Sequence, residues 1–397
     1  MQTNLDKMFK SYLEKKPIFK NKNTLTENYS PGNIVHREEQ INQIAKILAP
    51  AIREEKVSNV FIYGTVGTGK SLVVKHVTNE LAKASNKINT IYVNCKMKKI
   101  ADTEYRLLAE IIRCLGYNIP ATGLPTNQVY KTFFEKIDEK AQNIILILDE
   151  IDVIIKKTGD DILYNLTRIN QDLKNTRMSI IGISNDAFFI ENIDSRVKSS
   201  LSEEEIIFPP YNAHQLKDIL LQRAVMAFNE TVLGEGVIAK CAALAAQEHG
   251  DARKALDLLR IAGEIAEREG ATKISADFVD KAEEKLDVDR IVEVVKKQPK
   301  QSQAVLAAAI KLFEEGQKNI QTGDIFSVYE DICKNNGLKI LTQRRTSDLI
   351  SELDMLGIIS SRIISKGRYG RTREIRILLN KQLLEKIKTI LKQNYLL

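Results

Sequence analysis

The chain has 397 residues, of which 43% are hydrophobic and 28% charged, and its net charge is +7. This length is too great for one hydrophobic core, so we expect two or three domains. No apolar run reaches the roughly 18 residues of a membrane span, the first residues lack a signal-peptide core, and the four cysteines show no metal-binding spacing. These features argue against a membrane protein and a zinc or disulfide scaffold, and they favour the reducing cytoplasm.

The positive charge is concentrated at one end of the chain. Residues 290–397 contain 20 lysines and arginines against 11 aspartates and glutamates, a net charge of +9, which leaves the rest at −2. A basic terminal region on a nearly neutral body predicts a polyanionic partner, most simply nucleic acid. We therefore expect a nucleoid-associated protein.

The first 55 residues precede the first strong motif. Residues 1–30 are polar and rich in lysine, and we expect a peripheral arm with weak order. A helix is predicted over residues 37–55, because Ile41, Ile44 and Leu48 recur at helical spacing. This segment either forms a wall of a nucleotide base site or simply packs against the core, and the sequence does not decide between the two.

Residues 60–71 contain the strongest motif. Val60–Tyr63 is a β-branched and aromatic run that predicts a buried strand, and a helix is expected from Leu72. Between them lies the pattern G-x-x-x-x-G-K-S, whose glycines let backbone N–H groups surround phosphate oxygens. Lys70 can reach the β- and γ-phosphates, and the Ser71 hydroxyl can ligate Mg²⁺. The predicted nucleotide-binding residues are Gly64, Thr65, Val66, Gly67, Thr68, Gly69, Lys70 and Ser71.

Two acidic residues follow a later apolar run. After a strand predicted at residues 90–95, residues 144–148 are five large apolar side chains and predict a central parallel strand. Asp149 and Glu150 then lie at its carboxyl end, where ligands of α/β sheets bind. We expect Asp149 to hold the Mg²⁺ shell and Glu150 to polarise the attacking water.

A third strand is predicted over residues 178–184. Asn185 follows it and either orients the same water or is an ordinary turn residue, and the neighbouring motifs favour the first interpretation. Arg196, on an exposed turn, either reaches the nucleotide of a neighbouring subunit or is a plain surface arginine.

From Asn212 to Leu286 the pattern is helical, with helices predicted over 213–228, 235–248, 251–268 and 275–286. Arg253 lies in the first turn of the third, where a cation opposes the helix dipole by roughly 0.3–1 kcal/mol. Such a position suggests that Arg253 faces phosphate rather than solvent. Arg223 is a weaker candidate for nucleotide contact, and Tyr211 is placed to lie against the base.

The last hundred residues show the element order of a winged helix. After a charged link over 287–300, helices are predicted over 302–315, 322–335 and 342–356, then a strand over 357–365, a tight turn, a returning strand over 374–379 and a last helix. Basic residues fall on the two elements with which winged helices contact DNA. On the third helix the candidates are Gln343, Arg344, Arg345 and Ser347. On the hairpin they are Arg368, Tyr369, Arg371 and Arg373.

With these motifs in order, the chain resembles the archaeal replication-initiator family related to the origin-recognition-complex large subunit and the cell-division-cycle loading factor. The resemblance covers nearly the whole chain. Its motifs are Tyr29-x-Pro31, His36-Arg37-Glu38, the phosphate loop, Leu148-Asp149-Glu150-Ile151-Asp152, Asn185, the Ser195-Arg196-Val197 run, Phe208-x-Pro210-Tyr211, Gly250-Asp251-x-Arg253, and Thr322-Gly323-Asp324 with the basic hairpin.

The resemblance implies an α/β P-loop AAA+ base with a parallel sheet, an all-α lid and a C-terminal winged-helix domain. The implied ranges are 1–209, with a helical insertion at about 96–128, then 210–288 and 289–397. It further implies that Asn185 is sensor one, Arg253 sensor two and Arg196 an arginine finger acting in trans. The insertion of that family touches DNA, and the cations Lys96, Lys98, Lys99 and Arg106 fit such a contact here.

The implied function is that of an ATP-dependent DNA replication initiator. It would bind origin duplex DNA together with other initiator subunits, help recruit or load the replicative helicase, and use slow hydrolysis of ATP to ADP, with Mg²⁺, as a switch. The alternative is a clamp-loader-like or signalling AAA+ ATPase whose C-terminal domain binds protein. DNA affinity of the C-terminal domain separates the two hypotheses.

Overall fold

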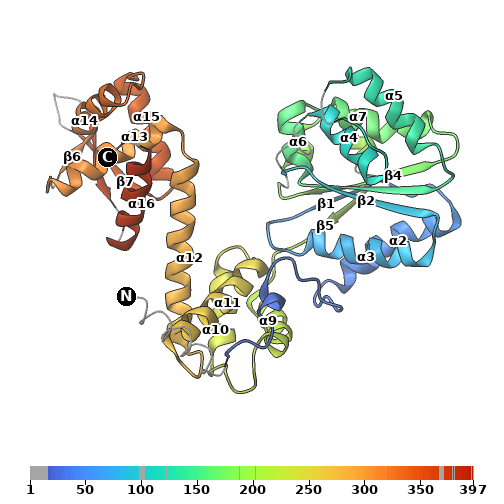
Figure 1. The fold of residues 1–397 in the computed structure, drawn as a ribbon, viewed down its shortest axis with the longest axis horizontal. Helices are drawn as coiled ribbons and strands as arrows, with labels where there is room; N and C mark the ends of the chain where they lie inside the picture. Colours follow the sequence, from blue (N-terminus) through green and yellow to red (C-terminus); the bar gives the residue numbers. More distant parts are fainter. Residues whose placement is uncertain are drawn as a thin grey trace, which may run out of the picture. The chain divides into compact units, whose positions relative to one another are not determined.

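The structure is a computed structural model, drawn as a ribbon in Figure 1. It describes residues 17–97, 103–120, 123–186, 188–201, 203–317, 319–365, 371–377, 379, 381–394 and 396. The chain divides between Val279 and Asp280 into two compact units. The first contains a parallel sheet followed by a helical part, and the second contains helices with a small antiparallel sheet.

A five-stranded parallel sheet, in the order β2-β3-β4-β1-β5, forms the centre of the first unit. Its strands are β1 (Val60–Tyr63), β2 (Ile88–Asn94), β3 (Asn143–Asp149), β4 (Arg177–Ser184) and β5 (Glu204–Ile207). β3 is buried along its whole length, as expected for a central strand with both faces covered. Because neighbouring strands are parallel, Asp149 at the end of β3 pairs in register with Ile183 of β4, two residues before Asn185. The predicted parallel sheet is confirmed.

Helices cover both faces of this sheet (Figure 1). On one face, α2 (Glu38–Leu48) and α3 (Lys70–Ala84) pack through apolar side chains such as Ile44 and Val73 against strand residues such as Ile62. The helix predicted to reach residue 55 instead continues as a 3₁₀ turn, η2 (Ala49–Arg53). The other face is covered by α4 (Glu104–Cys114), α5 (Thr126–Ile137), α6 (Ile151–Thr158), α7 (Asp161–Arg168), η3 (Ile169–Gln171), η4 (Phe189–Asn192) and α8 (Ser195–Leu201).

Residues 17–30 correct the expectation of a weakly ordered arm. Ile18 is buried, and Phe19 stacks on Phe228 with ring centroids 5.0 Å apart. The short turn η1 (Lys22–Leu25) follows, and its Lys22 forms a 2.8 Å ion pair with Glu264. The polar composition misled the sequence reasoning because a few apolar residues, spaced widely, anchor this segment to the helical part. Residues 1–16 lie outside the described residues.

The helical part of the first unit contains α9 (Ala213–Ala227), α10 (Val237–Gln247), α11 (Ala252–Glu269) and the start of α12 (Ala276–Lys297). The predicted end at residue 286 and the predicted link over 287–300 are wrong, because α12 continues without interruption to Lys297. Residues 276–298 contain no glycine or proline, and Pro299 is the first residue that stops a helix. Among the described residues no helix, α12 included, has the length and apolar character to cross a bilayer.

The second unit has the predicted winged-helix order. Its elements are α13 (Lys300–Glu314), β6 (Ile320–Gln321), α14 (Thr322–Asn335), α15 (Gln343–Met355), β7 (Ile359–Ser365), β8 (Arg371–Ile377) and α16 (Lys381–Gln393). The antiparallel strands lie in the order β6-β8-β7, and the returning strand begins at Arg371 rather than at the predicted Glu374. Buried side chains including Ile310, Tyr329 and Leu353 form its separate core.

Candidate functional site

The loop between β1 and α3 approaches the helical part so closely that glycine is required at two positions. Gly67 has a φ of +75° and Gly69 a φ of +88°, in the left-handed region that side chains disfavour. A Cβ at Gly67 would lie 1.7 Å from Asp251 Oδ1, and one at Gly69 would lie 2.9 Å from the Tyr211 hydroxyl. The glycine-rich loop therefore packs directly against the start of α11 and against Tyr211.

Lys70 begins α3 and places its ammonium group inside this loop. It is 5% exposed, and Nζ donates hydrogen bonds to the carbonyl oxygens of Gly64 and Thr65, both at 2.8 Å. Burial lowers the pKa of Lys70 to about 8, while the nearby Asp149 carboxylate opposes this shift. Because hydrogen bonds between charged groups are stronger than those to neutral carbonyls, a phosphate would be the better partner for this ammonium group.

The two acids at the end of β3 have different surroundings. Asp149 is buried; its Oδ1 accepts from the Glu150 backbone N–H at 2.9 Å, and its Oδ2 accepts from the Tyr92 hydroxyl at 2.5 Å. Glu150 has a φ of +54°, which is unusual for a residue with a side chain, and its Oε2 lies 3.2 Å from Lys96 Nζ. Burial and the hydrogen bond to Asp149 raise the pKa of Tyr92 well above its usual range, so Tyr92 is the donor. Asp149 is thus held by two hydrogen bonds, whereas Glu150 is engaged by one largely exposed cation.

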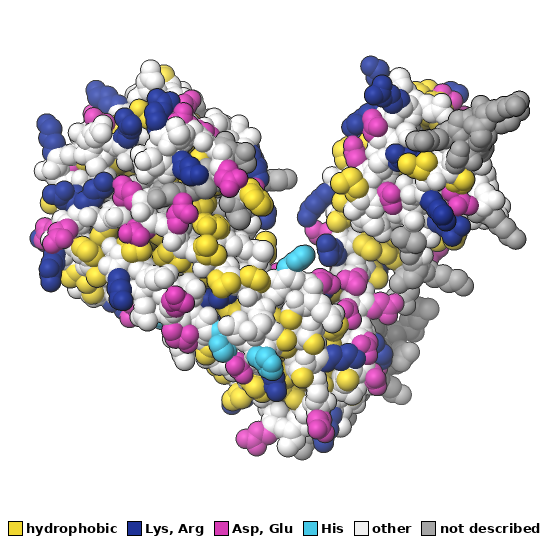
Figure 2. Space-filling view, turned by 180° about the vertical axis from the view of Figure 1, so that it is seen from behind, with side chains coloured by type: hydrophobic (Ala, Val, Ile, Leu, Met, Phe, Trp, Pro, Cys, Tyr) yellow, Lys and Arg dark blue, Asp and Glu magenta, His cyan; other side chains and the backbone are white. Residues whose placement is uncertain are grey.

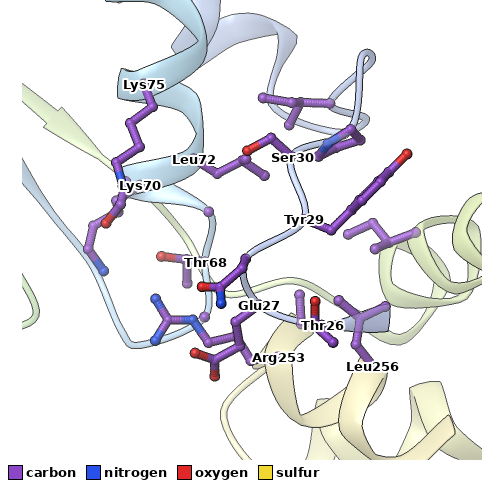
Figure 3. A pocket seen from close by; sticks show the side chains of 18 of the residues that line it. Thr26, Glu27, Tyr29, Ser30, Thr68, Lys70, Leu72, Lys75, Arg253 and Leu256 are labelled. Carbon is purple, nitrogen blue, oxygen red and sulfur yellow. The ribbon is translucent and has the colours of Figure 1, made fainter. Parts of the chain in front are cut away.

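A cavity of about 540 Å³ brings most of the predicted nucleotide residues together, whereas Gly64, Thr65 and Val66 do not line it. This volume lies within the range of about 300–1,000 Å³ that is usual for small-molecule sites. Figure 3 labels side chains from three parts of its lining, which are residues 26–30, the loop with α3, and helix α11. The ends of the strands and helix α9 complete the lining. The predicted residues that line it are Gly67, Thr68, Gly69, Lys70, Ser71, Asp149, Glu150, Asn185, Tyr211, Arg223 and Arg253.

The donor set on this cavity fits a magnesium ion carried by a phosphate ligand. Ser71 and Asp149 offer hydroxyl and carboxylate oxygens, the hard donors that Mg²⁺ prefers. The described residues contain no group of three or more His, Cys, Asp and Glu side chains placed to hold a metal by themselves. Mg²⁺ needs no such group in these sites, because it binds through one or two protein ligands plus substrate phosphates and water.

Arg253 and Asp251 join the helical part to the loop. The Asp251 side chain caps α11 by accepting from the Arg253 backbone N–H at 2.8 Å, and the Ala252 N–H donates to the Gly67 carbonyl at 3.2 Å. The Arg253 side chain lines the cavity (Figure 3). A cation at a helix start is unfavourable unless an anion is near, so Arg253 is placed to meet one.

Arg223 carries donors that lack partners. It is 5% exposed, and its Nε and Nη1 find no hydrogen-bond partner among the described residues. Its Nη2 donates to the Tyr29 carbonyl at 3.4 Å, and the guanidinium lies over the Tyr29 ring at 4.6 Å. Burial lowers the pKa of Arg223. Unsatisfied buried donors are costly, so a ligand acceptor in the cavity would stabilise this side chain.

Sequence reasoning missed Arg37, although its motif was noted. The Arg37 guanidinium is buried, donates to the Thr68 carbonyl at 2.9 Å and to the Pro209 carbonyl at 2.6 Å, and lies 3.8 Å from the centroid of the Tyr211 ring. It therefore ties the loop to the segment that leads into α9. One face of Tyr211 is consequently covered by Arg37, which leaves less of that ring to contact a base. No local sequence pattern reveals these contacts.

Arg196 lies away from the cavity of its own chain. Its Nε and Nη2 donate to the two Asp194 carboxylate oxygens at 3.1 and 3.0 Å, and its guanidinium lies 5.0 Å from the centroid of Tyr164. It does not line the cavity, and its side chain is 64% exposed. This position is compatible with both earlier interpretations, a surface arginine and one that reaches a neighbouring subunit.

A groove of about 510 Å³ lies on the second unit between the starts of α14 and α15 and the β7–β8 hairpin. It brings together four of the predicted contact residues, Gln343, Arg344, Ser347 and Arg373. Arg345 instead forms ion pairs with Asp348 and Glu352 at 3.7 and 3.5 Å. In the face that Figure 2 shows, lysine and arginine side chains are distributed over the second unit among acidic ones.

The remaining predicted contact residues are on the insertion and at the tip of the hairpin. Lys98, Lys99, Arg368 and Tyr369 lie outside the described residues, and only the backbone of Arg371 is described. Arg106 lies in the first turn of α4, half-buried, where its N–H donates to the Thr103 hydroxyl at 3.3 Å.

Three family models together match most of the chain. They are an ATPase domain predominantly from Archaea over residues 34–207, a Cdc6 AAA+ ATPase-type lid domain over 217–284, and a CDC6 C-terminal winged helix domain over 293–387. The order of these three domains matches the order in which the sheet, the helical part and the winged helix occur in the structure.

Curated relatives are similar over nearly their whole length. An ORC1-type DNA replication protein from Thermococcus onnurineus is 55% identical over 381 residues, which cover 94% of this chain and 91% of the relative. An ORC1-type DNA replication protein 1 from Methanosarcina acetivorans is 54% identical over 377 residues, with coverage of 94% and 90%.

Solved structures show the same similarity. The structure of the Aeropyrum pernix ORC1 protein in complex with DNA is 41% identical, covers 96% of this chain and 98% of its own, and superposes with a TM-score of 0.82. The Cdc6p structure from Pyrobaculum aerophilum, 22% identical with a TM-score of 0.58, shares the fold.

Proposed function

This chain belongs to the ORC1-type DNA replication proteins, and we propose that it is a replication initiator whose affinity for origin duplex DNA depends on the nucleotide that it binds. It is an AAA+ ATPase with a lid and a winged-helix domain. We assign the AAA+ base to residues 1–209, the lid to 210–288 and the winged-helix domain to 289–397. The observation that carries the proposal is the cavity in which the phosphate loop, the acid pair and the lid residue Arg253 meet.

We assign the binding of ATP to three parts of the cavity. Backbone N–H groups of the loop and the Lys70 ammonium group receive the phosphates, and Arg253 reaches them from the lid. Ser71 and Asp149 would hold a Mg²⁺ ion, and the ion would supply positive charge to offset that of the phosphates. Since these groups come from both base and lid, a nucleotide between them fixes the angle between base and lid.

Hydrolysis needs a base for the attacking water. Glu150 accepts the proton or polarises the water, and Asn185 holds that water from the end of the adjacent strand. Glu150 must first leave its ion pair with Lys96. Arg196 from a neighbouring subunit completes the charge stabilisation, so a monomer should turn over slowly.

We propose that duplex DNA lies along the groove of the winged helix. Gln343, Arg344 and Ser347 on α15 and Arg373 on the hairpin line that groove, which matches the element pair that winged helices place against DNA. The solved Aeropyrum pernix relative is bound to DNA, which supports this partner. The family assignment alone supports a further partnership with other initiator subunits and with the replicative helicase.

The nucleotide roles are tested by variants of the full-length chain. Lys70→Ala should abolish binding of a fluorescent ATP analogue, because it removes the buried ammonium group that lies inside the loop. Glu150→Gln should keep that binding and slow single-turnover hydrolysis by about 100-fold or more, the usual contribution of a general base.

Lys83→Ala and Glu191→Gln are matched controls, because both residues are exposed and neither lines the cavity. Both controls should bind and hydrolyse ATP as the wild type does. Equal turnover of wild type and Glu150→Gln would remove Glu150 from its assigned role.

A further inference from the structure

Tyr92 contacts the carboxylate that we assign to Mg²⁺, although no motif identifies it. It lies on β2 beside β3, and its hydroxyl donates to Asp149 Oδ2 at 2.5 Å. Lys75 Nζ lies over the Tyr92 ring, 3.8 Å from its centroid, and both side chains line the cavity. The ring is therefore held from one side by a cation while its hydroxyl is held by the acid.

These contacts fix the plane of the Asp149 carboxylate. Oδ1 accepts from the Glu150 backbone N–H at 2.9 Å, and Oδ2 accepts from Tyr92. Each oxygen can accept more than one hydrogen bond or ligand, so both retain capacity toward the cavity. Without the Tyr92 hydroxyl, the backbone contact to Oδ1 is the one hydrogen bond that the described residues would still donate to the group, and the carboxylate could rotate about it.

We propose that Tyr92 is a positioning residue for Mg²⁺, which holds Asp149 in the orientation in which its carboxylate would bind the metal. This inference rests on the proposed role of Asp149. Partners that orient a metal-binding side chain commonly change metal affinity by about 10–100-fold when they are removed. A tyrosine serves here because its hydroxyl bridges two neighbouring strands while its ring packs under Lys75.

The test uses the full-length chain with Tyr92→Phe, which keeps the ring and removes the hydroxyl. A fluorescent ATP analogue is titrated first in EDTA and then at increasing free Mg²⁺. We expect the affinity in EDTA to stay within about twofold of wild type. The Mg²⁺ concentration that gives half of the metal-dependent gain should rise about tenfold.

Two further variants separate the possible outcomes. Tyr63→Phe, at the end of strand β1 of the same sheet, should leave both quantities unchanged, because Tyr63 does not line the cavity. Asp149→Asn should remove the Mg²⁺ dependence; if it does not, the assigned role of Asp149 fails and this inference fails with it.

If Asp149→Asn behaves as expected, Tyr92→Phe decides the matter. An unchanged Mg²⁺ requirement in Tyr92→Phe would overturn the positioning role. An affinity that falls equally with and without Mg²⁺ would also overturn it, because Tyr92 would then act on the nucleotide or on the fold.

Discussion

At the scale of single residues, the site depends on close contacts between parts of the chain that are far apart in sequence. The absence of a side chain at Gly67 leaves room for Asp251 of the lid, and the Tyr92 hydroxyl donates to Asp149, 57 residues later in the sequence. The sequence predicted Lys70, the acid pair and Arg253 because those residues belong to local patterns with a chemical meaning. It could not predict Arg37 or Tyr92, since their roles arise from long-range packing that leaves no local pattern.

The contact between Gly67 and Asp251 gives a prediction at this scale. Gly67→Ala should destabilise the first unit by about 1 kcal/mol or more, because the residue has a positive φ and because the new methyl group must displace the Asp251 side chain that caps α11. Urea unfolding of the full-length chain measures this. Gly32→Ala is the control, because a Cβ at Gly32 meets nothing within 4 Å; equal destabilisation of both variants would contradict the argument.

At the scale of elements, the bounds of a helix were predicted well where the whole helix packs against a single hydrophobic core. The helices at 322–335 and 342–356 were predicted within a residue of α14 and α15, because an apolar stripe marks each inward face. The part of α12 beyond residue 286 was not predicted. Most of its side chains are charged or polar, and the two buried valines in this part, Val288 and Val295, are widely spaced. A charged segment of this kind looks like a linker in the sequence, because the core against which Val288 and Val295 pack is formed by residues far along the chain.

The N-terminal segment gives a prediction about pH. Burial alone would raise the pKa of Glu264, but its partners Lys22 and Arg260 outweigh it, and the net shift is downward. The stabilisation from Glu264 is therefore fully present above the unfolded-state pKa of about 4.3 and is lost as the pH falls through the lower folded-state value. Wild type should unfold at a higher temperature than Glu264→Gln at pH 6.

That difference should close as the pH falls below the folded-state pKa of Glu264, because residue 264 is then uncharged in both proteins. Glu235→Gln, at an exposed position before α10, should show no such pattern. A gap in unfolding temperature that stays constant from pH 6 to pH 3 would show that the charge of Glu264 does not hold the segment.

The groove of the second unit gives a prediction about DNA. Arg344 lines the groove, whereas Arg345 is already engaged by two carboxylates. If Arg344 contacts one phosphate, Arg344→Ala should reduce the slope of log affinity against log salt by about 1. Arg345→Ala should change that slope much less. Fluorescence anisotropy with duplex DNA measures both slopes.

The same titration also tests the choice of partner. If the wild-type chain has no affinity for duplex DNA even at low salt, the alternative of a C-terminal unit that binds protein is favoured. Equal slopes in the wild type and Arg344→Ala would remove Arg344 from the contact surface.

At the scale of the whole molecule, the chain separates two tasks. The nucleotide cavity lies entirely within the first unit, whereas the groove and the excess charge of residues 290–397 belong to the second. This separation was predictable, because the phosphate-binding motifs and the basic clusters occupy different parts of the sequence. A replication switch requires that the two tasks be coupled energetically, and coupling of this kind is reciprocal.

The most direct test of that coupling is the affinity of the full-length chain for duplex DNA, measured at one salt concentration with Mg-ATP, with Mg-ADP and without nucleotide. Allosteric coupling is typically worth about 5-fold or more in affinity, and we predict at least such a difference between ATP and ADP in wild type. We predict no difference in Lys70→Ala. Equal DNA affinity in all three states of the wild type, with nucleotide binding verified in parallel, would contradict the account.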